Sequence, residues 1–219
     1  MSDPDLDWDA APQALGLLQL REDLLYARIP VERRAALVAA ALEDGHSLAD
    51  WARDRRGRDP GSIAARCGVP VIHSQDDANI GSKIVYAEYV TRSPSITLYL
   101  PAIRRLDRLV SEQGAQARLG IDRTAPVFLA HELYHHFDCT RGGATLSRLH
   151  RIRLFGIGPW NWTSGLSSLS EIAAGAFAQR LLGLSFHPKL LDFLSIQTLD
   201  HGDHGGNQGK CNEELRGFS

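Results

Sequence analysis

Residues 130–138 of the chain read Ala-His-Glu-Leu-Tyr-His-His-Phe-Asp. Residues four apart on an α-helix project from the same face, so His131 and His135 can place both imidazoles on one metal ion. Glu132 points about a quarter-turn away, where its carboxylate can accept a proton from water beside that ion. Catalytic Zn²⁺ sites use three protein ligands, often neutral imidazoles, and keep one position open. The pattern predicts His131 and His135 as zinc ligands and Glu132 as the general base.

The preceding residues place this pattern on a helix. Residues 124–129 read Thr-Ala-Pro-Val-Phe-Leu, with Thr124 as a typical cap and Pro126 in the first helical turn. A short pattern can also arise by chance, so a surface helix with incidental histidines is the competing interpretation. The helical setting favours the metal site.

A third ligand has to come from another segment, and Glu171 is the predicted residue. Residues 170–182 read as a second helix, with Ala174 and Ala178 on the face that contains Glu171. Small side chains allow two helices to approach closely, as a ligand from a separate helix requires. The alternative is that Glu171 only complements the dipole of its own helix.

Together the two segments resemble the ImmA/IrrE family of bacterial zinc metallopeptidases. That family pairs Ala-His-Glu-x-x-His with a later Glu-x-x-Ala-x-x-Phe-Ala-x-x-Leu-Leu, and residues 130–135 and 171–182 fit the two patterns. The resemblance implies three zinc ligands and one catalytic carboxylate, which here are His131, His135, Glu171 and Glu132.

The resemblance extends over about residues 60–190. Residues 63–71 resemble the family's helix leading into a strand, and residues 95–100 resemble its next hydrophobic strand. The chain departs from the family where Gly175 replaces a frequent Asn or Asp, where Gly183-Leu184 replaces Met-Pro, and in its long spacer between the two helices. These departures concern the choice of substrate more than metal binding.

The composition predicts one compact core. The chain has 219 residues, 43% of them hydrophobic, and its formal charge of −2 gives no general reason to expect nucleic acid or an anionic membrane as partner. Residues 1–9 are acidic and lack the regions of a signal peptide, and no apolar run approaches the roughly 18 residues of a membrane span. Three scattered cysteines form no disulfide framework, so a cytoplasmic location is expected.

The N-terminal quarter of the chain is predicted to be helical. Residues 31–42 read as a helix that Gly45 ends, and Ser47 caps the next helix. The segment can also be interpreted as a helix-turn-helix whose arginines contact phosphate, namely Arg53, Arg55, Arg56 and Arg58. A glycine and a proline follow where a recognition helix would continue, which favours a solvated arginine cluster.

Strands are predicted for residues 69–73, 83–91 and 95–100, with Ser93-Pro94 as a turn between the last two. One of these strands is a candidate shelf on which a peptide substrate pairs through its backbone, although most such strands serve only the core. Residues 101–118 then read as an amphipathic helix.

Supporting roles fall to residues near the two central helices. His187, just before a helix predicted over residues 188–199, is the preferred catalytic donor to the oxyanion of the tetrahedral intermediate, and His150 or a strand tyrosine is the alternative. Asp138 is predicted to orient a ligand imidazole by accepting its second N–H. Cys139 extends the histidine stripe, either as a thiolate that reaches the metal or, more commonly, as a structural thiol.

Two further segments carry weaker patterns. Residues 140–170 read as a long loop of the kind that often forms a lid, and its Trp160 and Trp162 either grip a peptide or anchor the loop. The glycine-rich tail contains three residues that fit no tight structural-zinc spacing, namely His201, His204 and Cys211.

These inferences predict an α+β fold with a zincin-like metallopeptidase domain over residues 59–200, in which a small sheet packs on the His-Glu-x-x-His helix. Residues 1–58 form a helical N-terminal annex, and residues 201–219 form a flexible tail. The predicted activity is that of a zinc-dependent endopeptidase, and the resemblance implies a protein substrate such as a helix-turn-helix transcriptional repressor. The alternatives are a zinc-binding regulatory module that acts without proteolysis and a DNA-binding regulator.

Overall fold

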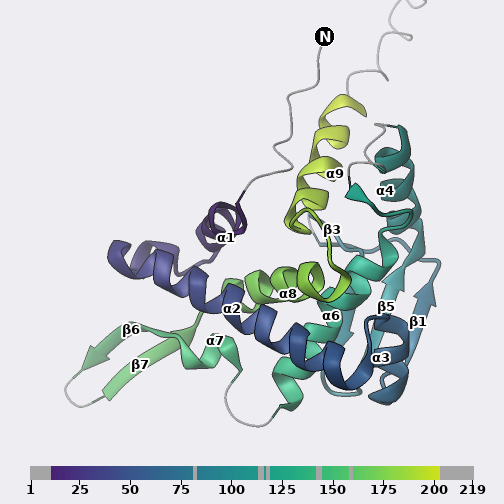
Figure 1. The fold of residues 1–219 in the computed structure, drawn as a ribbon. Coiled ribbons are helices and arrows are strands. Elements are labelled where there is room, and N and C mark those ends of the chain that lie inside the picture. Colours follow the sequence, from purple (N-terminus) through teal and green to yellow (C-terminus); the bar gives the residue numbers. More distant parts are fainter. Residues whose placement is uncertain are drawn as a thin grey trace, which may run out of the picture.

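The computed structural model has an α+β architecture (Figure 1). It describes residues 11–80, 83–112, 116, 119–141, 145–157 and 160–202. The described helices are α1 (Pro12–Arg21), the 3₁₀ helix η1 (Tyr26–Arg28), α2 (Val31–Arg56), α3 (Pro60–Arg66), α4 (Leu100–Glu112), α6 (Ala125–Thr140), α7 (Leu146–Leu149), α8 (Ser167–Leu182) and α9 (Lys189–Gly202). The described strands are β1 (Val71–Ser74), β2 (Asn79–Ile80), β3 (Lys83–Ile84), β4 (Ala87–Val90), β5 (Ser95–Tyr99), β6 (Arg151–Ile157) and β7 (Trp160–Gly165).

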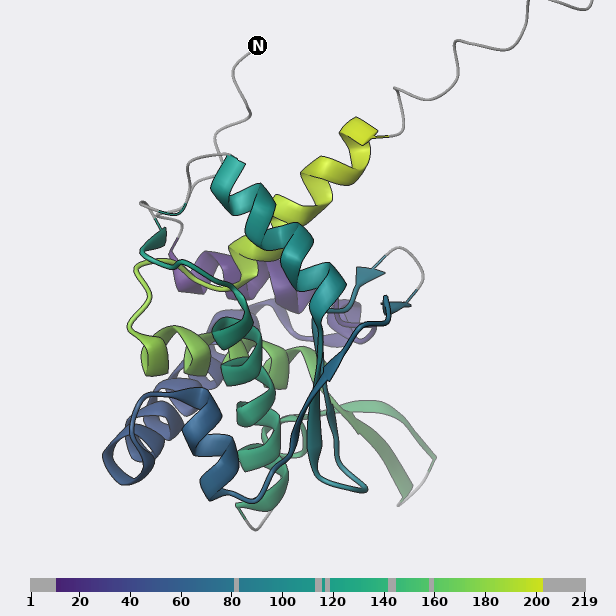
Figure 2. The ribbon, with the colours of Figure 1, turned by 90° about the vertical axis from the view of Figure 1, so that its right-hand side faces the viewer.

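A three-stranded sheet with the order β1-β5-β4 lies beside α6 (Figure 2). β1 runs parallel to β5, whereas β4 runs antiparallel to it with Tyr89 opposite Ile96. The predicted hairpin is confirmed for β4 and β5, but the first part of the strand expected over residues 83–91 is the separate strand β3, which pairs with β2. Within the described residues β4 forms one edge of this sheet.

The N-terminal helices differ from the prediction, because α2 runs without interruption from Val31 to Arg56. Gly45 does not end a helix, and Ser47 is likewise an interior residue of α2. Gly45 is buried against α8, where an added Cβ atom would overlap the carbonyl oxygen of Ala173. The glycine therefore allows two helices to touch, and α2 ends instead at Gly57, which has a φ of 91°.

The helices that carry the zinc-site pattern, α6 and α8, pack directly on each other, as the sequence predicts. α6 begins at Ala125 with Pro126 in its first turn. Thr124 does not cap this helix through its side chain, because its hydroxyl donates to the Asp107 carboxylate at 2.7 Å. The face of α8 that α6 and α2 cover is built from small buried residues, namely Ala173, Ala174, Gly175, Ala176 and Ala178.

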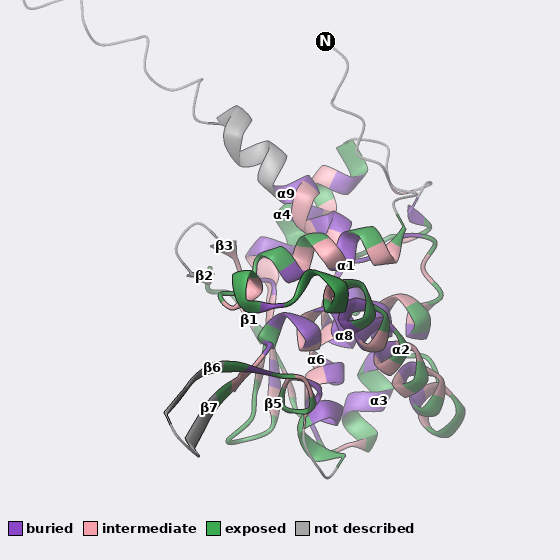
Figure 3. Cartoon of the chain, turned by 90° about the vertical axis from the view of Figure 1, so that its left-hand side faces the viewer, coloured by how far each residue is buried: buried purple, intermediate pink, exposed green. Residues whose placement is uncertain are grey.

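The N-terminal helices share one core with the rest of the chain. The Asp23 carboxylate, in the turn after α1, accepts hydrogen bonds from the Ser168 backbone N–H at 3.1 Å and from its hydroxyl at 2.8 Å, so it caps α8. One cluster of buried hydrophobic side chains contains Leu37 and Val38 of α2 together with Ile172 of α8. Figure 3 shows the same arrangement, with α8 largely buried and α2 partly exposed. The annex thus supports the second of the two site helices.

The described residues between 140 and 170 form α7 and a hairpin of β6 and β7, so the prediction of a long loop is wrong. Turn-forming glycine and proline between two runs of β-branched and aromatic residues favour a hairpin, a pattern that the loop interpretation overlooked. In Figure 1 the hairpin extends away from the helices. The side chains of Trp160 and Trp162 lie outside the described part of the structure.

The C-terminal part begins with α9, which matches the helix predicted after His187. Of the three tail residues considered as metal ligands, His204 and Cys211 lie outside the described residues, and only the backbone of His201 is described. None of the described helices combines the length and the apolar character needed to cross a membrane.

Candidate metal centre

Three predicted ligands converge between α6 and α8. His131 and His135 extend from the same face of α6, and Glu171 reaches them from the first turns of α8. The Nε2 atom of His131 lies 3.2 Å from Glu171 Oε2, and the Nε2 atom of His135 lies 3.4 Å from Glu171 Oε1. One ligand atom from each residue lies within 4.8 Å of those of the other two. The three side chains are therefore close enough to bind one metal ion.

These separations can be compared with the geometry that zinc requires. Nitrogen and oxygen ligands at about 2.0–2.1 Å from a tetrahedral ion lie about 3.3 Å from each other. The two nitrogen–oxygen separations, 3.2 Å to Glu171 Oε2 and 3.4 Å to Glu171 Oε1, lie close to that value, each for a different oxygen of the carboxylate. Two nitrogens and one carboxylate oxygen also suit a borderline-soft divalent ion that leaves a position open. The donor set therefore suits a divalent metal ion that keeps a coordination position open.

Glu132 lines the same cavity as the three ligands. Burial raises the pKa of its carboxyl to about 7, with a further increase from the nearby Glu171 charge, while His131 acts in the opposite direction. The Tyr89 backbone N–H, on strand β4, hydrogen bonds to this carboxylate. A carboxyl group with a pKa near 7 is suited to accept and release a proton at neutral pH.

The two histidine ligands have different electrostatic surroundings. Burial lowers the pKa of His135 to about 4, and the neighbouring His131 lowers it further. Burial also lowers the pKa of His131, but the hydrogen bond and the charge of Glu171 outweigh this effect and leave the pKa raised. A neutral His135 has the lone pair that a metal ligand needs.

His187 lines this cavity from the segment before α9. Its side chain is 2% exposed, and its Nδ1 atom accepts a hydrogen bond from the Lys189 backbone N–H at 3.2 Å. The proton of the neutral ring is therefore on Nε2, and burial keeps the ring neutral by lowering its pKa to about 4. Among the described residues, this buried Nε2 has no hydrogen-bond partner.

The alternative oxyanion donors are less well placed. His150 does not line the cavity, whereas Tyr86, Tyr89 and Tyr99 do. The hydroxyls of these tyrosines are engaged with Ser195, with His136 Nδ1 at 3.1 Å, and with Glu88 Oε2 at 3.0 Å, respectively. Of these candidates in the described residues, His187 alone has a donor without a hydrogen-bond partner, and this Nε2 atom is itself buried beside Gly175.

Gly175 of α8 leaves room for the His187 ring. A Cβ atom at this position would lie 2.8 Å from His187 Cε1 and 3.1 Å from His187 Nε2. Any other residue at this position of α8 would push the His187 ring away. The sequence alone did not reveal this pairing, because nothing in the local spacing places residue 187 beside residue 175.

The cavity has a volume of about 720 Å³ and runs along β4 past the ligand cluster. Cys139 lies on its wall and is exposed, but it is not one of the three residues grouped as possible metal ligands within the described chain. Burial and the nearby Asp138 charge raise the pKa of its thiol, which opposes the thiolate required for the redox-switch interpretation.

The chain matches no protein-family model, no curated protein and no solved structure. The convergence of three ligands and a carboxylate in one cavity is therefore the main physical support for a function.

Proposed function

We propose that this protein is a zinc-dependent endopeptidase, as the resemblance to the ImmA/IrrE family implies. The observation that carries the proposal is the convergence of His131, His135 and Glu171 from two helices, with donor separations of 3.2 and 3.4 Å. Glu132 in the same cavity adds a proton acceptor next to this cluster. A site that only stabilised the fold would have four protein ligands and no need for such a group.

The chain's own residues have complementary roles in this proposal. Zinc, when bound, supplies a Lewis acid that polarises a carbonyl and lowers the pKa of water. Glu132 accepts the proton of the attacking water and later delivers it to the leaving amine. The His187 Nε2–H donates a hydrogen bond to the carbonyl oxygen as negative charge develops on it.

Strand β4 offers the surface for the substrate backbone. The Tyr99 backbone N–H donates to the Tyr86 carbonyl at 2.9 Å, so the alternating ladder directs the backbone groups of Ala87 and Tyr89 away from β5, on the side where the Tyr89 N–H meets Glu132. Ala87 and Tyr89 both line the cavity. An extended peptide that pairs with this edge passes the ligand cluster, which supports a protein substrate. The resemblance implies that the protein substrate is a transcriptional repressor.

The test is cleavage of a quenched fluorescent peptide library by the parent protein and by Glu132→Gln. We expect zinc-dependent cleavage by the parent and a loss of about 10²–10⁴-fold in the variant, because the proton acceptor is removed. Both proteins should retain zinc. The matched control is Glu112→Gln, which changes an exposed glutamate at the end of α4 that does not line the cavity and should leave cleavage unchanged.

Other outcomes separate the alternatives. Equal cleavage by the parent and Glu132→Gln would remove the proposed role of this carboxylate. Retained zinc without cleavage in either protein would favour a zinc-binding module. Binding to duplex DNA that weakens steeply with salt would favour a nucleic-acid-binding regulator.

A further inference from the structure

The His135 ring is held on both sides by two consecutive residues of α8. Glu171 contacts its Nε2 atom at 3.4 Å, and the hydroxyl of Ser170 lies 3.4 Å from its Nδ1 atom. The same hydroxyl donates to Asp138 Oδ2 at 3.3 Å. Asp138 was expected to contact a ligand imidazole directly, whereas it reaches His135 through Ser170.

The hydrogen-bonding capacities of these groups determine where the protons lie. An ionised carboxylate only accepts hydrogen bonds, so the single hydroxyl proton of Ser170 points to Asp138. The hydroxyl oxygen is then left to accept a hydrogen bond from His135, which places the imidazole proton on Nδ1. The Nε2 atom of His135 consequently keeps its lone pair towards Glu171 and the metal centre.

Asp138 is fixed in its role as acceptor by further contacts. Its side chain is 4% exposed, and its Oδ1 atom accepts hydrogen bonds from Arg141 at 2.7 Å and from the Leu146 backbone N–H at 3.0 Å. Arg141 and the Leu146 backbone thus hold Oδ1, which leaves Oδ2 to accept the hydrogen bond from Ser170.

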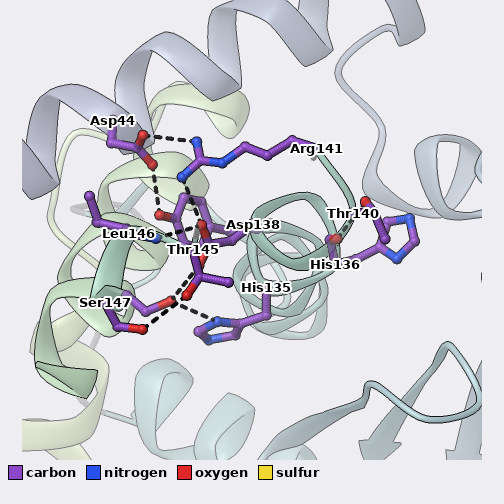
Figure 4. Close-up of polar contacts among 11 residues, drawn as sticks. Asp44, His135, His136, Asp138, Thr140, Arg141, Thr145, Leu146 and Ser147 are labelled. Atoms are coloured by element: carbon purple, nitrogen blue, oxygen red, sulfur yellow. Dashed lines mark hydrogen bonds and ion pairs between the residues drawn. The ribbon is translucent and has the colours of Figure 1, made fainter. Parts of the chain in front are cut away.

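The chain of contacts continues into the N-terminal helix α2. Arg141 also donates to Asp44 Oδ1 at 2.8 Å, and the buried Tyr134 hydroxyl donates to Asp44 Oδ2 at 2.7 Å. In Figure 4 the Arg141 guanidinium lies between the carboxylates of Asp44 and Asp138, with His135 beyond Asp138. Asp44 stands next to Gly45, the residue that allows α2 to touch α8.

We propose that Ser170 and Asp138 are positioning residues that select the metal-binding tautomer of His135, and that Asp44 of α2 supports them through Arg141. The proposal rests on the metal centre of the proposed function and does not depend on proteolysis. Helix α2 thereby contributes to metal affinity, although Asp44 lies ninety residues before Tyr134 in the sequence.

The first test compares zinc affinity in Ser170→Ala and Ser170→Thr, measured by competition with a chelator. Ser170→Ala removes the acceptor for the His135 Nδ1–H, and we expect zinc affinity to fall about 10–100-fold. Ser170→Thr keeps a hydroxyl and should restore the parent affinity. The absorption spectrum of the Co²⁺-substituted protein should change in the alanine variant and return in the threonine variant, which a loss of stability alone would not produce.

The second test uses Asp138→Asn and a matched pair on α2. The side-chain amide introduced by Asp138→Asn can donate a hydrogen bond to the Ser170 oxygen. The Ser170 hydroxyl then donates to His135 Nδ1, so the imidazole proton lies on Nε2, the atom that should bind the metal. Zinc affinity should therefore fall at least as far as in Ser170→Ala. Asp44→Asn should give a smaller loss. Asp50→Asn is the control, because Asp50 also lies on α2 and binds an arginine, Arg180, at 3.0 Å, but has no contact with this network.

Parent-like zinc affinity in both Ser170→Ala and Asp138→Asn would overturn the proposal. Equal losses in Asp44→Asn and Asp50→Asn would remove the role of Asp44 and point to general destabilisation of α2. These outcomes differ from failure of the proposed function, in which the parent protein itself binds no zinc or cleaves no peptide. The Ser170 pair keeps the test valid if Asp138→Asn does not fold.

Discussion

The proposed role of His187 as a hydrogen-bond donor depends on a single atom, its Nε2. Its Nε2–H is buried without a partner in the described chain, while its Nδ1 is held by the Lys189 backbone. A buried donor without an acceptor costs free energy, and the proposed oxyanion role requires the ring to expose this N–H to the substrate carbonyl. The close approach of Gly175 indicates that the ring has to remain in this position.

Replacing His187 by alanine should lower kcat for peptide hydrolysis by about 10²–10³-fold, because a donor to the developing oxyanion is lost. The zinc content and KM should not change, since this hydrogen bond strengthens only in the transition state. His150→Ala is the control and should keep the parent kcat, because His150 does not line the cavity. A parent-like kcat in His187→Ala would exclude the donor role.

Gly175→Ala tests the same site through geometry. The added Cβ atom would lie 2.8 Å from His187 Cε1, so the ring must shift while the ligands stay in place. We expect reduced kcat with unchanged zinc affinity, measured on the same peptide. Reduced zinc affinity with unchanged kcat would show that the glycine serves the metal ligands instead.

At the level of single residues, the sequence was informative where spacing along one helix sufficed. His131, His135 and Glu132 follow from helical periodicity, and Glu171 followed from its position on a second helix with small residues. Gly175 and Ser170 could not be assigned, because their partners, His187 and His135, are brought to them only by the packing of separate segments.

Among the secondary-structure elements, the contact between α2 and α8 depends on Gly45. A glycine inside a helix costs roughly 1 kcal/mol relative to alanine, which is why the sequence predicted a helix end there. Close packing against Ala173 outweighs this cost, and local propensity does not contain that information. The hairpin of β6 and β7 was missed for a similar reason, because a long spacer was interpreted as a loop.

Gly45→Ala should destabilise the protein by about 1–3 kcal/mol despite the better helix propensity of alanine, because the new methyl group overlaps the backbone of α8. The measurement is urea unfolding of EDTA-treated protein. Gly61→Ala is the control, because a Cβ atom there would meet only Asp59 Oδ2 at 3.5 Å, an ordinary contact. That variant should be neutral or slightly stabilised. Equal effects in both variants would contradict the packing argument.

The start of α3 gives a pH-dependent prediction. The Asp59 carboxylate accepts a hydrogen bond from the Ser62 backbone N–H at 2.7 Å, and its hydrogen bonds to Ser62 lower its pKa. Asp59→Ala should therefore cost about 1 kcal/mol at pH 7. A lowered pKa means that this contribution is present above the unfolded pKa of about 3.9 and is lost as pH falls below it. Urea unfolding should show the difference between parent and variant shrinking towards pH 3, whereas a constant difference would contradict the capping role.

For the whole molecule, the candidate metal centre connects two helices that the rest of the fold holds in contact. A metal that binds the folded chain and not the unfolded chain should stabilise it by about 2.7 kcal/mol at a free concentration of one hundred times Kd. The melting temperature should rise with added zinc in the parent and in Glu112→Gln, and it should not rise in Glu171→Ala. A similar rise in Glu171→Ala would place the stabilising ion elsewhere.

The most direct test of the central claim is the zinc content of the purified parent protein and of Glu171→Ala, determined by elemental analysis against protein concentration. Convergence of His131, His135 and Glu171 predicts one zinc ion per chain in the parent and little in the variant. No zinc in the parent, or the same amount in both proteins, would contradict the metal centre and the hydrolytic function that depends on it.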